Sequence, residues 1–106
     1  MSEPLDPWIE GYLEYARDVK KLTKRSVVDK RCSLKKVTEK MASIRPDVPL
    51  WKLSLEDYVY WINMEREEGT SEFTIQKDIS HVRGLIDYAW RAGKTDRNVL
   101  DGFYLK

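Results

Sequence analysis

The chain has 106 residues, 42% of them hydrophobic and 35% charged, which is the balance of a single soluble domain with one modest core. Its net charge of +1 argues against a protein that coats nucleic acid by charge alone, and its single cysteine, Cys32, excludes a disulfide framework and a zinc cluster. No apolar run approaches the ~20 residues that span a bilayer, and the N-terminus lacks a signal-peptide pattern. We therefore expect a cytoplasmic protein with no membrane partner, no metal and no cofactor.

Helix signals divide the chain into four segments, and no segment alternates with the period of two that a strand needs, so we expect an all-α fold. The first helix begins with Asp6 as N-cap and Pro7 at the first helical position, and it runs to about Leu22. The second begins at Ser26, because Ser26-Val27-Val28-Asp29 resembles a capping box, and two prolines end it.

The third helix has a capping box of its own, from Ser54 to Asp57. Leu53 precedes this box and is placed to pack onto Tyr58 as a hydrophobic staple. Gly69 stops the helix.

The fourth helix begins at Thr74, ends near Gly93 and has a sharply divided surface. Its apolar arc is formed by Ile75, Ile79, Val82, Ile86 and Ala89, and the opposite side carries Lys77, Ser80, Gly84 and Arg91. A glycine in a helix interior costs roughly 1 kcal/mol relative to alanine, so Gly84 on the solvent face indicates that a backbone or a phosphate approaches there. An ordinary amphipathic helix with one tolerated glycine explains the same pattern.

The second and fourth helices match one another at an offset of 48 residues. Each begins with a hydroxyl residue followed by an apolar one, Ser26-Val27 and Thr74-Ile75. Helix N-termini present free N–H groups and a positive dipole end, so both starts are candidate phosphate contacts. Ser26 and Thr74 are equally well explained as caps alone.

Charge is concentrated in bands along the chain. Residues 17–40 hold ten basic residues against three acidic ones, whereas residues 1–16 hold four acids and no base and residues 52–72 hold six acids against two bases. The basic band indicates a face turned toward a polyanion, although a run of basic residues is also typical of a solvated helix surface.

These segments together resemble the core-binding domain, the SAM-like N-terminal domain, of tyrosine recombinases of the phage integrase family. The resemblance covers nearly the whole chain and is strongest in Gly69-Thr70-Ser71, Thr74-Ile75, Val82-Arg83, Ile86, Tyr88-Ala89 and Gly93. Two positions depart from the family pattern. Lys30 stands where the family usually has a core aromatic residue, and Asn98 is followed by Val99 rather than by proline.

The resemblance implies a four-helix SAM-like bundle, with or without a short fifth C-terminal turn, that forms one half of a clamp around duplex DNA. Residues 1–106 are then one domain, with a helical core at about 6–93 and an exit at 94–106 toward an absent catalytic domain. The family's catalytic residues lie beyond this chain, so we expect no catalytic residue and no enzyme activity in it. The parent protein would be a tyrosine recombinase of bacterial, phage or mobile-element origin.

The expected partners are double-stranded DNA, the catalytic domain of the same parent chain and other recombinase protomers in a synaptic tetramer, with the isolated domain monomeric. We expect the second and fourth helices to meet the duplex mostly at phosphates, with Gln76 as the base reader because its amide pairs bidentately with adenine. The expected DNA-binding residues are Lys24, Arg25, Ser26, Arg31, Lys35, Thr74, Gln76, Lys77, His81, Gly84 and Arg91.

The competing hypothesis is a helical protein-interaction module without DNA binding, in which the acidic first and third helices dock a basic partner. The position of the charge discriminates between the two. DNA binding requires the basic band to join the polar face of the fourth helix in one surface.

Overall fold

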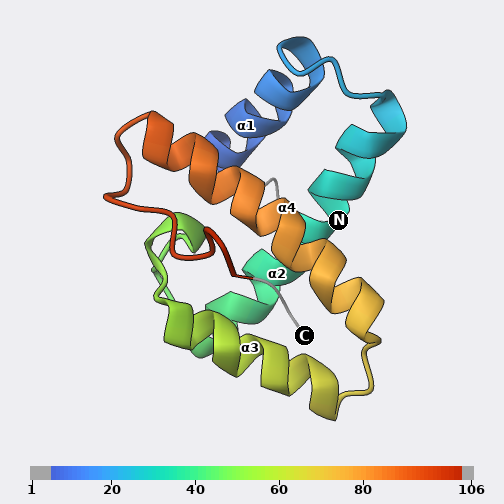
Figure 1. Ribbon diagram of the computed structural model, residues 1–106, viewed down its shortest axis with the longest axis vertical. Helices are drawn as coiled ribbons and strands as arrows, with labels where there is room; N and C mark the ends of the chain where they lie inside the picture. The colour runs from blue at the N-terminus through green and yellow to red at the C-terminus, as the bar shows by residue number, and fades with distance from the viewer. Residues whose placement is uncertain (1–5, 104–106) are drawn as a thin grey trace.

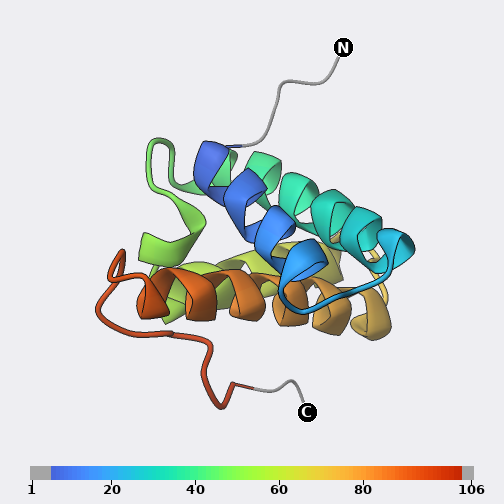
Figure 2. The same cartoon turned by 90° about the horizontal axis from the view of Figure 1, so that it is seen from above.

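The computed structural model describes residues 6–103 and contains helices but no strand within that range, which confirms the predicted all-α fold. The α-helices are α1 (Pro7–Asp18), α2 (Lys24–Ile44), α3 (Leu55–Glu67) and α4 (Glu72–Arg91), and a single 3-10 turn, η1 (Leu50–Lys52), precedes α3 (Figure 1). Seen from above, α1 and α2 form one layer, and α3 and α4 form a second layer beneath it (Figure 2).

The first helix begins as its sequence predicts and ends earlier. The Asp6 carboxylate accepts a hydrogen bond from the Trp8 backbone N–H at 2.8 Å, and Pro7 occupies the first turn. The predicted end at Leu22 is wrong, because α1 stops at Asp18 and Lys21 then adopts a left-handed backbone with φ 54°. This residue turns the chain back toward α2.

The predicted starts of α2 and α4 are wrong by three residues. Thr23 caps α2, accepting a hydrogen bond from the Ser26 backbone N–H at 3.1 Å. Ser71 caps α4 in the same way, accepting from the Thr74 backbone N–H at 3.2 Å. Ser26 and Thr74 therefore lie inside the first turns, and the offset of 48 residues holds for the actual caps.

The capping box of α3 is confirmed. The Ser54 hydroxyl accepts from the Asp57 N–H at 3.2 Å, and the Asp57 carboxylate accepts from the Ser54 N–H at 3.1 Å. Leu53 and Tyr58, the expected staple, are both buried.

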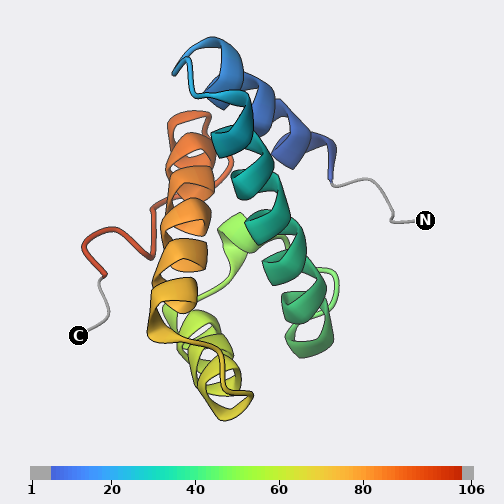
Figure 3. The same ribbon diagram turned by 90° about the vertical axis from the view of Figure 1, so that its right-hand side faces the viewer.

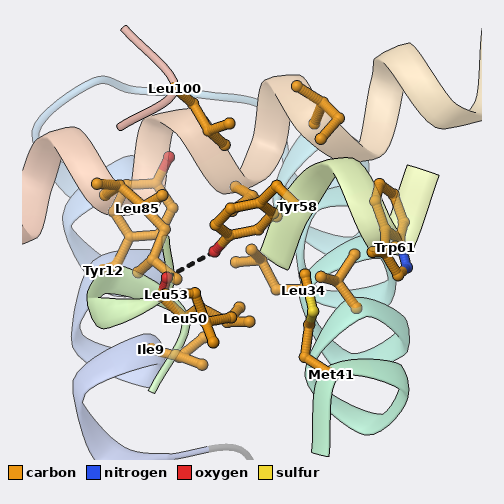
Figure 4. Close-up of a cluster of buried hydrophobic side chains, with 14 of the residues drawn as sticks. Ile9, Tyr12, Leu34, Met41, Leu50, Leu53, Tyr58, Trp61, Leu85 and Leu100 are labelled. Atoms are coloured by element: carbon orange, nitrogen blue, oxygen red, sulfur yellow. Dashed lines mark hydrogen bonds between the residues drawn. The ribbon is translucent and has the colours of Figure 1, made fainter. Parts of the chain in front are cut away.

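One core lies between the layers and is centred on α4, which packs against α1, α2, α3 and η1. Trp61, Tyr12 and Tyr58 are its largest fully buried side chains. The Tyr58 hydroxyl donates to the Leu50 carbonyl at 2.5 Å and so ties α3 to η1 (Figure 4). Residue Leu100 is also completely buried, so the chain after α4 contributes to this core.

The segment after α4 folds back along it. The Asn98 side chain donates to the Arg83 carbonyl at 3.2 Å, and the Arg83 guanidinium donates to the carbonyls of Leu100, at 3.0 Å, and of Phe103. Arg83 thus holds the segment that follows its own helix.

Candidate nucleic-acid interface

The two helices with the expected DNA-binding residues pack directly against each other and run in opposite directions (Figure 3). Lys30 of α2 lies near Gly84 of α4, and Lys36, farther along α2, pairs with Asp78, which is earlier in α4. The helix starts therefore lie at opposite ends of the pair. Lys24 and Lys77 are separated by about twelve residues of helix, roughly 18 Å, so they cannot share one phosphate.

The basic band and the polar face of α4 meet at His81. This side chain is half-buried, and burial lowers its pKa below the ordinary value, with a further lowering from the charge of Lys30 on α2 and then of Lys77 on α4. Two carboxylates, Asp78 foremost, act in the opposite direction. Basic and acidic groups of both helices thus act on one imidazole.

Lys30 stands at the position where an aromatic residue was expected, and it is half-buried between α1 and α4. Its ammonium lies 5.8 Å from the centre of the Tyr12 ring, a cation–π contact. Burial lowers the pKa of Lys30, and the charge of Lys20 adds to the effect. The aliphatic stem thus fills part of the space that an aromatic ring would take, while the ammonium stays near His81.

Gly84 does not lie on an open solvent face, so that part of the prediction is wrong. A Cβ added at Gly84 would lie 2.5 Å from the Tyr12 hydroxyl and 4.0 Å from the Lys30 ammonium. The group that approaches Gly84 is the side chain of Tyr12 on α1, not a backbone. Burial raises the pKa of Tyr12 to about 12, so its hydroxyl stays protonated at neutral pH.

Two expected residues of α2 lie on its other side. The Arg31 guanidinium pairs with the Glu10 carboxylate of α1 at 2.5 Å, which turns it away from α4. Lys35 lies one helical turn after Arg31 and therefore on the same flank. The structure does not bring Arg31 and Lys35 together with the α4 residues.

Lys36 is, with Lys30, a basic residue of α2 that faces α4, and sequence reasoning missed it. Its ammonium lies 2.6 Å from the carboxylate of Asp78, which is only 1% exposed. A signal was present, because Asp78 falls between Ile75 and Val82 in the apolar arc of α4. An acid at a buried position needs a basic partner from a neighbouring helix.

The remaining expected residues lie at the surface. Lys24, Arg25, Gln76 and Lys77 are exposed, whereas Ser26 and Thr74 are half-buried. Among the described residues, Lys24, Arg25 and Lys77 form no ion pair, so their charges are available. Arg91 is exposed but already paired, its Nε lying 3.0 Å from the Asp87 carboxylate of the same helix.

Neither a metal centre nor a membrane span is found in the described part of the chain. Within residues 6–103, no three His, Cys, Asp or Glu side chains are grouped as metal ligands. No helix there has the length and apolar character to cross a bilayer.

One comparison with known proteins gives a match. The family model described as the phage integrase N-terminal SAM-like domain matches residues 9–93, which include all four α-helices or most of each. Neither the curated proteins nor the solved structures contain a match to the chain.

Proposed function

Because the chain belongs to the phage integrase N-terminal SAM-like domain family, we propose that it is the core-binding domain of a tyrosine recombinase and grips duplex DNA with α2 and α4. Its fold is the SAM-like helical bundle of that family, and the family is that of the N-terminal domain rather than the catalytic one. In this proposal the reaction belongs to a separate catalytic domain of the parent chain.

The observation that carries the proposal is the junction at His81. There the charges of Lys30 of α2 and Lys77 of α4 both act on one imidazole, with Asp78 and Asp29 acting against them, so basic residues of the two helices lie near one another. This proximity is what supports a shared DNA-binding face. Arg25 lies eleven residues before Lys36, on the same flank of α2, and has no acidic partner among the described residues. Lys24, also without such a partner, lies seven residues before Arg31 and so on the flank of Arg31.

The contacts divide by type. Lys24 and Arg25 at one end of the helix pair and Lys77 nearer the other would neutralise phosphates on the two sides of a major groove that is ~12 Å wide. Gln76 would read adenine at the groove edge. Arg31, Lys35 and Arg91 would reach flanking phosphates, and Arg31 and Arg91 would first exchange their intramolecular carboxylates for them.

The proposed partners follow from the family. They are double-stranded DNA, the catalytic domain of the same parent protein and other recombinase protomers, in a cytoplasmic system of bacterial, phage or mobile-element origin. DNA integration or recombination would be the process served by the parent protein.

The protein-interaction hypothesis has weaker support, because several acids that it relies on are occupied. Glu10 pairs with Arg31, and Asp57 pairs with Arg45 at 3.1 Å. Lys40 lies 2.5 Å from Glu68 and 3.7 Å from Glu65. A basic partner would have to displace these internal cations.

A salt titration tests the proposal. We expect the affinity of the domain for a fluorescein-labelled 16-base-pair duplex, followed by anisotropy, to fall linearly with salt on a double logarithmic plot. Lys77→Gln should reduce the slope by about 1, because one phosphate contact is lost. Lys52→Gln, an exposed lysine of η1 outside the interface, is the matched control and should leave the slope unchanged. Equal slopes for the wild type and Lys77→Gln would contradict the assignment.

A further inference from the structure

Phe73, in the first turn of α4, is the most exposed of the large hydrophobic side chains in the described part of the chain. It is 77% exposed, compared with 62% for Val19 and 58% for Tyr60. The core lies on the opposite side of α4, so Phe73 contributes little to packing. The apolar surface of Phe73 is therefore exposed to solvent and available for contact with a partner.

The neighbours of Phe73 are the residues expected to face DNA. Gln76 and Lys77 follow it by three and four positions, which places all three side chains on adjacent parts of one helix face, and all three are exposed. Glu72, the one acid of this first turn, is neutralised by Arg66, whose guanidinium lies 2.8 Å from its carboxylate. A polyanion approaching Phe73 therefore meets no uncompensated negative charge in this turn.

The major groove offers one kind of apolar group to such a side chain. Base edges there present hydrogen-bond donors and acceptors, together with the C5 methyl group of thymine. We propose that Phe73 contacts thymine C5 methyl groups in the major groove and makes the domain favour A·T pairs. Gln76, one helical turn farther along, would then lie beside the adenines of the same A·T-rich segment, since adenine is its preferred bidentate partner. This inference rests on the proposed DNA-binding function.

The experiment compares two 16-base-pair duplexes, one of alternating dA and dT and the other of alternating dA and dU. Uracil pairs with adenine as thymine does and lacks only the C5 methyl group. We expect the wild-type domain to bind the thymine duplex about fourfold more tightly, which is the effect of roughly one buried methyl group. Phe73→Ala should bind both duplexes with the wild-type affinity for the uracil duplex.

Two further variants fix the interpretation. Phe73→Leu keeps an apolar side chain and should retain part of the preference for thymine. Tyr60→Ala removes another exposed aromatic side chain, on α3, and should retain all of it. Circular dichroism checks that each variant is folded, which we expect because both positions are exposed.

The contrary outcomes are distinct. Equal wild-type affinity for the two duplexes, or a preference for thymine that persists in Phe73→Ala, would overturn the role of Phe73 and leave the DNA-binding proposal intact. Sedimentation that shows self-association of the wild type, lost in Phe73→Ala together with an unchanged preference for thymine, would also overturn it and assign Phe73 to a protein contact. Absence of binding to both duplexes would instead reject the proposed function and this inference with it.

Discussion

At the scale of single residues, the side chain of Tyr12 on α1 lies against Gly84 of α4. The hydroxyl of Tyr12 occupies the space beside Gly84, where a Cβ would lie 2.5 Å away, while the next ring atom would be 3.6 Å from it. The clash would therefore come from the hydroxyl oxygen alone. Glycine at position 84 lowers the helix propensity of α4, but it leaves the space that the Tyr12 hydroxyl of α1 occupies.

We predict that Gly84→Ala destabilises the domain by about 1–3 kcal/mol, because the clash outweighs the gain in helix propensity of ~1 kcal/mol. In the Tyr12→Phe background the same change should be neutral or stabilising, since the clashing oxygen is gone. Urea unfolding followed by circular dichroism measures both. Gly11→Ala, also within a helix but with nothing within 4 Å of an added Cβ, is the control and should stabilise the domain. Destabilisation of similar size in both backgrounds would refute this account.

The ion pair of Lys36 and Asp78 makes a second residue-level prediction. Lys36→Met leaves a carboxylate buried without its cation, and we expect a loss of about 1–3 kcal/mol in the free energy of unfolding. Lys35→Met, at the neighbouring position with no ion pair among the described residues, should cost much less. Equal losses from the two variants in thermal or urea unfolding would show that the pair is not important for stability.

His81 gives the domain a pH dependence. Its folded-state pKa is lowered by burial and by Lys30, so the unfolded chain binds the proton more tightly. The free energy of unfolding should therefore be highest, as far as His81 affects it, above the ordinary histidine pKa of ~6.5. It should decrease as the pH falls from there toward the lower folded-state pKa. His81→Gln should flatten this part of the profile, which urea unfolding between pH 7.5 and 5 would measure. A profile that is the same in both proteins would exclude His81 as its source.

At the scale of elements, the sequence predicts the helices better than their ends. The start of α3 is predicted correctly, because Ser54 and Asp57 are both residue types that form a capping box and Leu53 precedes them as the staple residue. At α2 and α4 the sequence contains two hydroxyl residues three positions apart, Thr23 with Ser26 and Ser71 with Thr74, and either can cap. The earlier residue is the cap in both cases. The early end of α1 was not predictable, since no glycine or proline marks it.

The caps lead to a prediction at this scale. Thr23→Ala and Ser71→Ala should each cost about 1 kcal/mol of stability, because a backbone N–H loses its acceptor. Ser26→Ala should cost less, since the Ser26 hydroxyl caps no backbone group and only accepts a hydrogen bond from Thr23. Thermal unfolding of the three variants provides the comparison. A larger loss for Ser26→Ala than for Thr23→Ala would contradict the cap assignment.

At the scale of the whole molecule, the sequence predicts the fold and the two helices of the candidate interface, but not which flank of each helix is exposed. Helical periodicity separates the buried side from the rest. It does not show that α1 covers Gly84, or that Arg31 points to α1 and Lys36 to α4. These assignments depend on the antiparallel packing of α2 on α4, which no single segment encodes.

The most direct test of the central claim is a nitrogen-15 NMR titration of the domain with a short duplex at two salt concentrations, since half of a clamp is expected to bind weakly. We predict that amides around Lys24 to Lys36 and around Phe73 to His81 shift together, and that the shifts shrink at the higher salt as counterion release requires. Shifts confined to α1 and α3, or no shifts in these two segments at low salt, would contradict DNA binding through α2 and α4.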